Sequence, residues 1–189
     1  LANGMTKKEI IEDFPELRYR LINTGQHYDK RMSGDFFEQL GIPAPDINLQ
    51  VGSGTQAVQT AAIMIRYEEV LHKSPADLCL VVGDVNSTMA CAVTAQKLGI
   101  PVAHVEGGIR SFDWTMPEEI NRLVTDAITN WFFTTSTFAN ENLRAAGISA
   151  ERIFFVGNTM IDTLNKNLPR LRKPSIWDKP LQGRTPHPT

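Results

Sequence analysis

The sequence is poor in cysteine and has no excess of charge of either sign. Its 189 residues include two cysteines, and 19 basic against 21 acidic side chains leave a formal net charge of -2. Cys79 and Cys91 lie in apolar or small-residue stretches at a spacing that matches no zinc pattern, so we expect buried thiols rather than a disulfide or a metal site. The balanced charge gives no electrostatic reason to expect nucleic acid or an anionic membrane as a partner.

Long apolar runs and the common nucleotide-binding motifs are also missing. No stretch approaches the roughly 18 apolar residues of a membrane-spanning helix, and residues 1–10 show no apolar signal region. Together with reduced, buried thiols, this favours a cytoplasmic protein. The chain carries neither a G-x-G-x-x-G turn nor a Gly-Lys-Ser/Thr phosphate loop, so NAD binding and P-loop hydrolysis lack support. No His, Cys or carboxylate cluster has the spacing of metal ligands, and we expect no metal.

Short apolar runs alternate with longer helical patterns along the chain. The runs predict strands at 17–23, 77–83, 101–107, 131–135 and 152–157. The helical patterns cover 33–40, 55–73, 86–98, 117–129 and 137–146, with a further helix from near Asn158. This order predicts an α/β fold with a Rossmann-like parallel sheet and helices on both faces. We expect residues 1–174 to form this domain and 175–189 to be an irregular, proline-rich tail.

Helical periodicity predicts which side chains of two helices face the core. In 55–73 the inward positions are Val58, Ala61, Ala62 and Ile65. In 117–129 they are Ile120, Leu123, Val124, Ala127 and Ile128.

Two carboxylates follow predicted strands directly. Asp84 stands one residue after "CLVVG" and Glu106 directly after "VAHV". Ligands of such sheets bind beyond the carboxyl ends of the strands. If the two strands are neighbours, the carboxylates share one crevice, where like charge raises one pKa and leaves a proton donor beside a base. Two alternatives are structural: Asp84 caps the next helix, and Glu106 pairs with Arg110.

We expect the glycines after Glu106 to let a ligand approach the backbone.

Glu118 has a structural explanation of its own. "TMPEE" matches a capping box with Thr115 as the cap, and Arg122 lies four residues on, at ion-pair spacing. His27 lies in a loop at a strand end, where a ligand contact and a hydrogen-bonded turn are equally compatible with the sequence. His104 is inside an apolar strand and is predicted to be a buried histidine with its hydrogen bonds satisfied.

Five motifs in order carry a resemblance to a known family: "TGQHYD", "VVGDVNST", "IPVAHVEGGIRS", "MPEEINR" and "FVGNTMIDTL". Together they resemble the non-hydrolysing UDP-N-acetylglucosamine 2-epimerases, over about Leu17 to Leu168. The resemblance implies the N-terminal half of a two-domain GT-B architecture, with its first strand missing. It implies inversion at C2 of UDP-N-acetylglucosamine, giving UDP-N-acetylmannosamine, by elimination and re-addition of UDP without a cofactor.

The same resemblance assigns roles to individual residues. It makes Asp84, Glu106 and Glu118 catalytic, and it implies substrate-binding roles for Gln26, His27, Arg110 and Arg122. It also implies a UDP-sugar as substrate, a homodimer for the full-length protein, and an inactive fragment without the second domain. Three alternatives stay open: a hydrolysing epimerase, a non-catalytic sugar-nucleotide-binding or assembly module, and, more distantly, a GT-B glycosyltransferase.

Overall fold

The computed structural model describes residues 13–25 and 44–170, and the chain divides into two compact units, 1–157 and 158–189. Within the first unit, all the described strand pairs are parallel. One sheet contains β1 (Ile22–Asn23) and β2 (Ile47–Asn48), and the other has the order β3 (Cys79–Val82), β4 (Val102–Val105), β5 (Trp131–Thr134), β6 (Ile153–Phe155). The predicted parallel α/β class is therefore confirmed.

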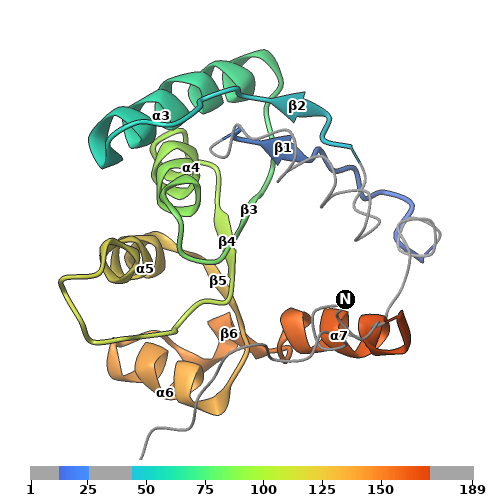
Figure 1. The fold of residues 1–189 in the computed structure, drawn as a ribbon, viewed down its shortest axis with the longest axis vertical. Helices are drawn as coiled ribbons and strands as arrows, with labels where there is room; N and C mark the ends of the chain where they lie inside the picture. Colours follow the sequence, from blue (N-terminus) through green and yellow to red (C-terminus); the bar gives the residue numbers. More distant parts are fainter. Residues whose placement is uncertain (1–12, 26–43, 171–189) are drawn as a thin grey trace, which may run out of the picture. The chain divides into compact units, whose positions relative to one another are not determined.

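Helices alternate with these strands, as the sequence predicts (Figure 1). They are α3 (Gln56–Lys73), α4 (Asn86–Lys97), α5 (Pro117–Ile128) and α6 (Thr137–Ala145), and a 3-10 turn, η1 (Ala150–Arg152), precedes β6. The second unit holds α7 (Thr159–Asn167) and the 3-10 turn η2 (Leu168–Arg170). None of the helices in the described ranges combines the length and apolar character needed to cross a membrane.

The first predicted strand is shorter than expected, and its partner was not predicted. Of 17–23, only Ile22–Asn23 is a strand, and it pairs with Ile47–Asn48. Two residues between "PAPD" and "LQVGSG" are too few to show a period, so local sequence gives no strand signal there. The predicted helix at 33–40 and the tail at 175–189 lie outside the described residues.

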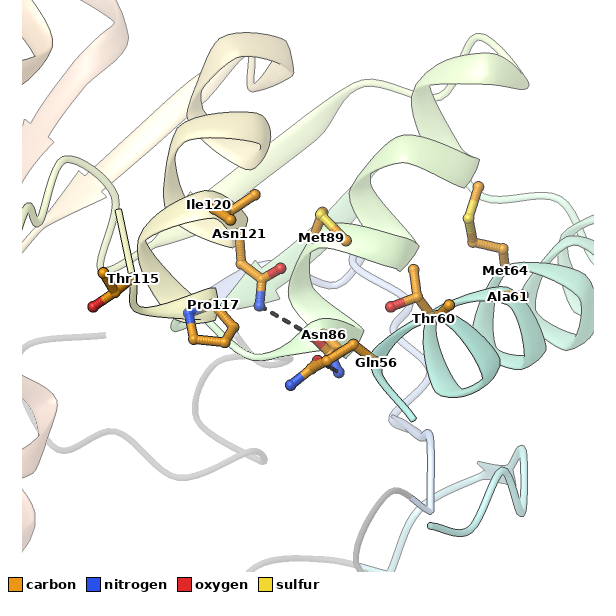
Figure 2. Close-up of a pocket in the computed structure, with 11 residues that line it drawn as sticks. Gln56, Thr60, Ala61, Met64, Asn86, Met89, Thr115, Pro117, Ile120 and Asn121 are labelled. Atoms are coloured by element: carbon orange, nitrogen blue, oxygen red, sulfur yellow. Dashed lines mark hydrogen bonds between the residues drawn. The ribbon is translucent and has the colours of Figure 1, made fainter. Parts of the chain in front are cut away.

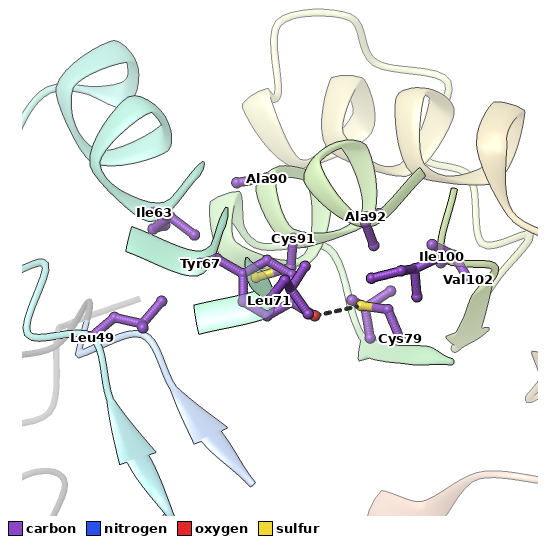
Figure 3. Packing of buried hydrophobic residues seen from close by; sticks show 12 residues of the cluster. Leu49, Ile63, Tyr67, Leu71, Cys79, Ala90, Cys91, Ala92, Ile100 and Val102 are labelled. Carbon is purple, nitrogen blue, oxygen red and sulfur yellow. Dashed lines mark hydrogen bonds between the residues drawn. The ribbon is translucent and has the colours of Figure 1, made fainter. Parts of the chain in front are cut away.

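The main hydrophobic core lies between α3, α4 and the first two strands of the larger sheet (Figure 3). Both cysteines are free thiols inside it, as predicted, and the Tyr67 hydroxyl donates a hydrogen bond to Cys79 Sγ at 3.2 Å. Burial raises the pKa of both thiols, which keeps them protonated and unreactive.

The predicted inner face of α3 is wrong, because the helix is rotated about its axis and buries a different face. Val58 and Ile65 are 62% and 59% exposed, whereas the buried side chains follow an i, i+4 stripe of Gln59, Ile63, Tyr67 and Leu71. The stripe with Tyr67 and Leu71 buries more apolar area than one containing two alanines, which favours the observed rotation.

The two faces of the larger sheet differ sharply within the described residues. Side chains on the face towards α3, α4 and α5 are buried, including Val81, His104 and Phe132. On the opposite face, Leu80 and Val82 are 53% and 54% exposed. The helix-covered face therefore supplies the framework that supports the strand ends described next.

Candidate active site

The ends of β3 and β4 lie side by side, as the carboxylate argument requires. The two strands pair in parallel with Val82 opposite Val105. The Gly83 N–H continues this pairing by donating to the Val105 carbonyl at 3.0 Å. Asp84 and Glu106 therefore leave the sheet at the same edge, which meets the condition on which the shared crevice depends.

Asp84 is held by the first turns of α5. Arg122 Nη2 donates to Asp84 Oδ2 at 2.5 Å, and Asn121 Nδ2 donates to the Asp84 carbonyl at 2.9 Å. The side chain of Asp84 remains one-third exposed. The capping alternative is wrong, because the cap of α4 is Val85, which makes no side-chain cap hydrogen bond. Asp84 is thus an ion-paired carboxylate that still faces solvent.

Glu106 combines backbone strain with a carboxylate that has no partner in the described part of the chain. Its φ is +72°, a left-handed conformation that costs a non-glycine residue about 1–3 kcal/mol. Its carboxylate makes no hydrogen bond or ion pair within residues 13–25 and 44–170. The alternative pairing with Arg110 is wrong, because the Arg110 guanidinium binds Asp126 Oδ2 at 2.6 Å. Strain and an unpaired carboxylate at a strand end are features of a functional residue.

The two glycines after Glu106 serve packing rather than ligand approach. A Cβ on Gly107 would lie 2.9 Å from Phe132 Cδ1, and one on Gly108 would lie 2.5 Å from the Ala139 carbonyl oxygen. Both glycines are buried. The expectation that they leave the backbone open to a sugar nucleotide is therefore wrong. They bring the turn after Glu106 against β5 and α6, which fixes the position of Glu106.

We expect Gly108→Ala to lower the free energy of unfolding by about 2–5 kcal/mol, because it adds a clash to a positive φ. Gly147→Ala is the matched control: its φ is +84°, like the +83° of Gly108, but a Cβ there would meet nothing within 4 Å. It should cost about 1–2 kcal/mol. Urea denaturation of both variants checks this, and equal losses would contradict the packing role.

Helix α5 presents its polar side to the site, contrary to prediction. Ile120 and Val124 are 43% and 36% exposed, and Ala127 is also exposed. Leu123 and Ile128 are half-buried. The buried positions are instead Glu119, Asn121, Thr125 and Asp126. Their burial follows from specific hydrogen bonds to loop backbone and arginines, which the apolar periodicity does not register.

Glu119 is the centre of one of these arrangements and is only 2% exposed. It accepts hydrogen bonds from Ser111 N and Ser111 Oγ at 2.9 and 3.0 Å, from Phe112 N at 3.2 Å and from Arg122 Nη1 at 3.0 Å. Burial alone would raise its pKa, but the hydrogen bonds from Ser111, Arg122 and Phe112 outweigh burial and hold the pKa below its usual range. Glu119 therefore fixes Arg122, which in turn holds Asp84.

Glu118, the neighbouring residue, is free of the structural roles that the sequence allowed. The helix cap is Met116, without a side-chain cap bond, and the Thr115 hydroxyl donates to Asp113 Oδ1 at 2.6 Å. The capping box is therefore wrong. Arg122 pairs with Glu119 and Asp84 rather than with Glu118. Glu118 is half-buried, and its carboxylate makes no hydrogen bond or ion pair with any described residue.

The predicted binding residues have different outcomes. Arg122 lies at the site, and its pKa is raised: burial alone would lower it, but the hydrogen bonds and charges of Glu119 and Asp84 outweigh burial. The Arg110 side chain is 7% exposed and is held by Asp126. Gln26 and His27 lie outside the described residues. In the described ranges, no group of three or more His, Cys, Asp or Glu is placed to hold a metal ion.

Sequence reasoning missed Glu119, Asn121 and Asp126. A signal was present, since these residues and Arg122 form a polar stripe along the predicted helix 117–129. The prediction relied instead on the apolar stripe of the same helix and placed that stripe on the buried face. A helix that carries both a polar and an apolar stripe buries the polar one only when its side chains find specific hydrogen-bond partners. In this helix, those partners come from loops that are distant in the sequence.

The site and fold together define a class of ligand-binding domain. It is a parallel α/β sheet with carboxylates and an arginine at the carboxyl edge of neighbouring strands, where such sheets bind ligands. The sequence family described as UDP-N-acetylglucosamine 2-epimerase matches residues 9–187. The chain belongs to this family.

Known relatives agree with this assignment. A UDP-N-acetylglucosamine 2-epimerase of Methanocaldococcus jannaschii is 45% identical over 171 residues, which cover 86% of this chain and 47% of that protein. The crystal structure of the M. jannaschii enzyme in complex with UDP-GlcNAc and UDP superposes with a TM-score of 0.79 at 45% identity, over 85% of this chain and 45% of that one. A UDP-2,3-diacetamido-2,3-dideoxy-D-glucuronate 2-epimerase of Pseudomonas aeruginosa is 43% identical over 85% of this chain and 46% of its own length. The chain thus spans about half the length of these relatives.

Proposed function

We propose that this chain is the N-terminal half of a two-domain GT-B sugar-nucleotide epimerase. It acts in the inversion of C2 of UDP-N-acetylglucosamine, giving UDP-N-acetylmannosamine, by elimination and re-addition of UDP. The observation that carries the proposal is Glu106: its backbone is strained, its carboxylate has no partner among the described residues, and it lies with Asp84 at the edge where β3 and β4 end. Because the chain spans about half of its relatives, it requires a second domain for turnover.

The chemistry needs groups that move a proton on each face of C2 and groups that stabilise the leaving diphosphate. Glu106 and Glu118 have carboxylates without partners among the described residues, so both are available for proton transfer. Asp84, ion-paired with Arg122, supplies a third carboxylate of fixed orientation. Arg122 contributes positive charge at the same edge, where it offsets charge on a diphosphate. Gln26, His27 and Arg110 complete the proposed substrate contacts.

Product analysis of the full-length protein tests the proposed function. The protein is incubated with UDP-N-acetylglucosamine, and the products are separated by anion-exchange chromatography. Formation of UDP-N-acetylmannosamine supports the proposal. Free N-acetylmannosamine with UDP indicates a hydrolysing enzyme. No turnover, despite binding, indicates a non-catalytic module. The P. aeruginosa relative gives a reason to test UDP-2,3-diacetamido-2,3-dideoxy-D-glucuronate as a competing substrate.

We also propose that the full-length protein is a homodimer, with a surface groove between α3, α4 and α5 at its interface. Met64, Met89 and Ile120 lie along this groove, and its lining is predominantly apolar (Figure 2). The exposed Val58 and Val124 lie on the same helices. Apolar area of this kind at a surface is typical of protein interfaces.

The charge-introducing variant Ile120→Asp is expected to convert the dimer to a monomer, because a carboxylate in an apolar interface is left without a partner. Ile120 is 43% exposed, so folding itself should change little. Sedimentation velocity measures the mass. The control, Glu141→Lys, changes an exposed α6 residue outside the groove and should stay dimeric. A wild-type monomer, or a dimeric Ile120→Asp variant, would contradict this interface.

Two further proposals concern the cellular setting and the extent of the domain. A cytoplasmic location is supported by two free, buried thiols. The proposed Rossmann-like domain covers residues 1–174, and a further strand in its sheet is supported by the two separate sheets. Within the described ranges, β1 and β3 each have one edge without a strand partner, and one additional strand would join them.

A further inference from the structure

His104 lies in β4 with both ring nitrogens engaged, and it is 1% exposed. Nε2 is 2.8 Å from the Gly83 carbonyl oxygen, and Nδ1 is 2.8 Å from Asp126 Oδ1. Gly83 immediately precedes Asp84. The imidazole therefore links the end of β3 to helix α5 from inside the sheet, beneath the two carboxylates of the site.

Asp126 extends this link to the turn after Glu106. Its second oxygen, Oδ2, accepts hydrogen bonds from the Gly108 N–H at 3.0 Å and from Arg110 Nη1 at 2.6 Å. Asp126 is 4% exposed. A single buried carboxylate thus holds the imidazole on one side and the Gly108–Arg110 turn on the other.

The hydrogen-bond partners of His104 determine which of its ring nitrogens carry a proton. A carbonyl oxygen is only an acceptor, so Nε2 carries a proton. Asp126 accepts from a guanidinium and a backbone N–H on Oδ2, which favours its ionised form, and an ionised carboxylate is also only an acceptor. Nδ1 therefore carries a proton as well. The described charged groups around the ring are Asp126 from α5 and, beyond it, Arg110; Glu106 lies two residues along the strand.

We propose that His104 is a buried imidazolium that, with Asp126, positions Asp84 and Glu106 for catalysis. It touches no reacting atom and acts through Gly83, Gly108 and Arg110. Its role in turnover rests on the proposed function, whereas its protonation state does not. A neutral histidine would leave one of its two acceptor partners without a donor, and buried acceptors without donors destabilise the arrangement that holds the two strand ends together.

The variant Asp126→Asn removes the negative charge of the Asp126 side chain but keeps its shape. The amide can donate through Nδ2 to an unprotonated Nδ1 while its oxygen still accepts from Gly108 and Arg110. Every hydrogen bond is kept, but His104 becomes the neutral, Nε2-protonated tautomer. The control is Asp77→Asn, an exposed residue before β3 that leaves the charge of the network unchanged.

Two-bond nitrogen–proton NMR spectra of the full 189-residue chain, labelled at histidine, read the protonation state directly. In the wild type at pH 7, His104 should show both nitrogens protonated, with exposed His72 as the internal reference. In Asp126→Asn it should show one unprotonated nitrogen. A neutral His104 in the wild type at pH 7 would overturn the proposal even if the variant fails to fold.

Kinetics of the full-length protein test the positioning role. Asp126→Ala, which removes the contacts to His104, Gly108 and Arg110, should lower kcat about 10–100-fold through misplacement of the carboxylates, while KM changes little. Asp126→Asn, which keeps these hydrogen bonds, should restore most of the wild-type kcat, and Asp77→Asn should match the wild type. An unchanged kcat in Asp126→Ala would remove the positioning role. If the wild type turns over no UDP-sugar, the proposed function fails, but the NMR result stands by itself.

Discussion

Each of the variants Asp84→Asn, Glu106→Gln and Glu118→Gln is expected to lower kcat of the full-length protein by about 10²–10⁴-fold, the usual contribution of a positioned acid or base. The amides keep the size of the side chain but neither release nor take up a proton. Glu106 and Glu118 have no hydrogen bond or ion pair to lose among the described residues. Their variants should therefore fold like the wild type, and the loss should be in chemistry alone.

Asp84→Asn differs in one respect. It also breaks the ion pair with Arg122, so a moderate loss of stability accompanies the loss of turnover. Glu141→Gln, an exposed carboxylate on α6, is the matched control and should keep the wild-type rate. Rates are measured at saturating and at limiting UDP-N-acetylglucosamine. Wild-type kcat in all three site variants would refute the assignment of the carboxylates.

Removal of the Glu119 carboxylate should strongly lower the free energy of unfolding, whereas removal of its neighbour's carboxylate should not. Glu119→Ala leaves the Ser111 and Phe112 N–H groups and the Arg122 guanidinium without their buried acceptor. The breaking of a buried charge pair costs about 3–5 kcal/mol. Glu118→Ala, one residue away, should change the free energy of unfolding by less than about 0.5 kcal/mol.

The pH dependence of unfolding gives an independent measure of Glu119. Its pKa is lowered in the folded protein, so the unfolded state binds the proton more tightly. The stability that Glu119 contributes is fully present above the usual glutamate pKa of about 4.3 and is lost as the pH falls through the lowered folded value. Glu119→Gln should therefore show a shallower loss of stability in acid than the wild type. Parallel curves would contradict the buried, ionised state of Glu119.

Adjacent glutamates thus have different environments, which the sequence alone does not separate. "PEE" predicts a helix start with two favourable acids, and the family resemblance points to the first of them. In the tertiary structure, Glu119 points inward to Ser111 and Arg122, while Glu118 makes no such contact with a described residue. One position along a helix turns the side chain by about 100°, so the difference arises from how α5 is oriented.

The order of strands and helices could be predicted because it depends on local patterns. Apolar runs and periodic segments give β3 to β6 and α3 to α6 close to their observed bounds. The rules for parallel sheets placed Asp84 and Glu106 at the carboxyl ends of their strands. That β3 and β4 are neighbours was a condition at the level of the sequence, and the structure supplies it.

Helix rotation and glycine function could not be predicted in the same way. The buried face of α3 depends on how much apolar area each face can bury, and the buried face of α5 depends on hydrogen-bond partners for its polar side chains. Glycine is needed at positions 107 and 108 because Phe132 and Ala139 lie too close to leave room for a Cβ. Each of these partners is distant in sequence. The His104–Asp126 contact is of the same kind, since it joins a strand to a helix 22 residues away.

Solvent isotope incorporation tests the central claim most directly. The full-length protein is incubated with UDP-N-acetylglucosamine in D₂O, and the recovered nucleotide sugars are examined by mass spectrometry and proton NMR. Carboxylates that remove the C2 proton on one face and return one on the other should place a single deuterium at C2 of the UDP-N-acetylmannosamine formed, and Glu106→Gln should suppress this incorporation. Conversion without deuterium at C2, or full incorporation by Glu106→Gln, would contradict a site built on these carboxylates.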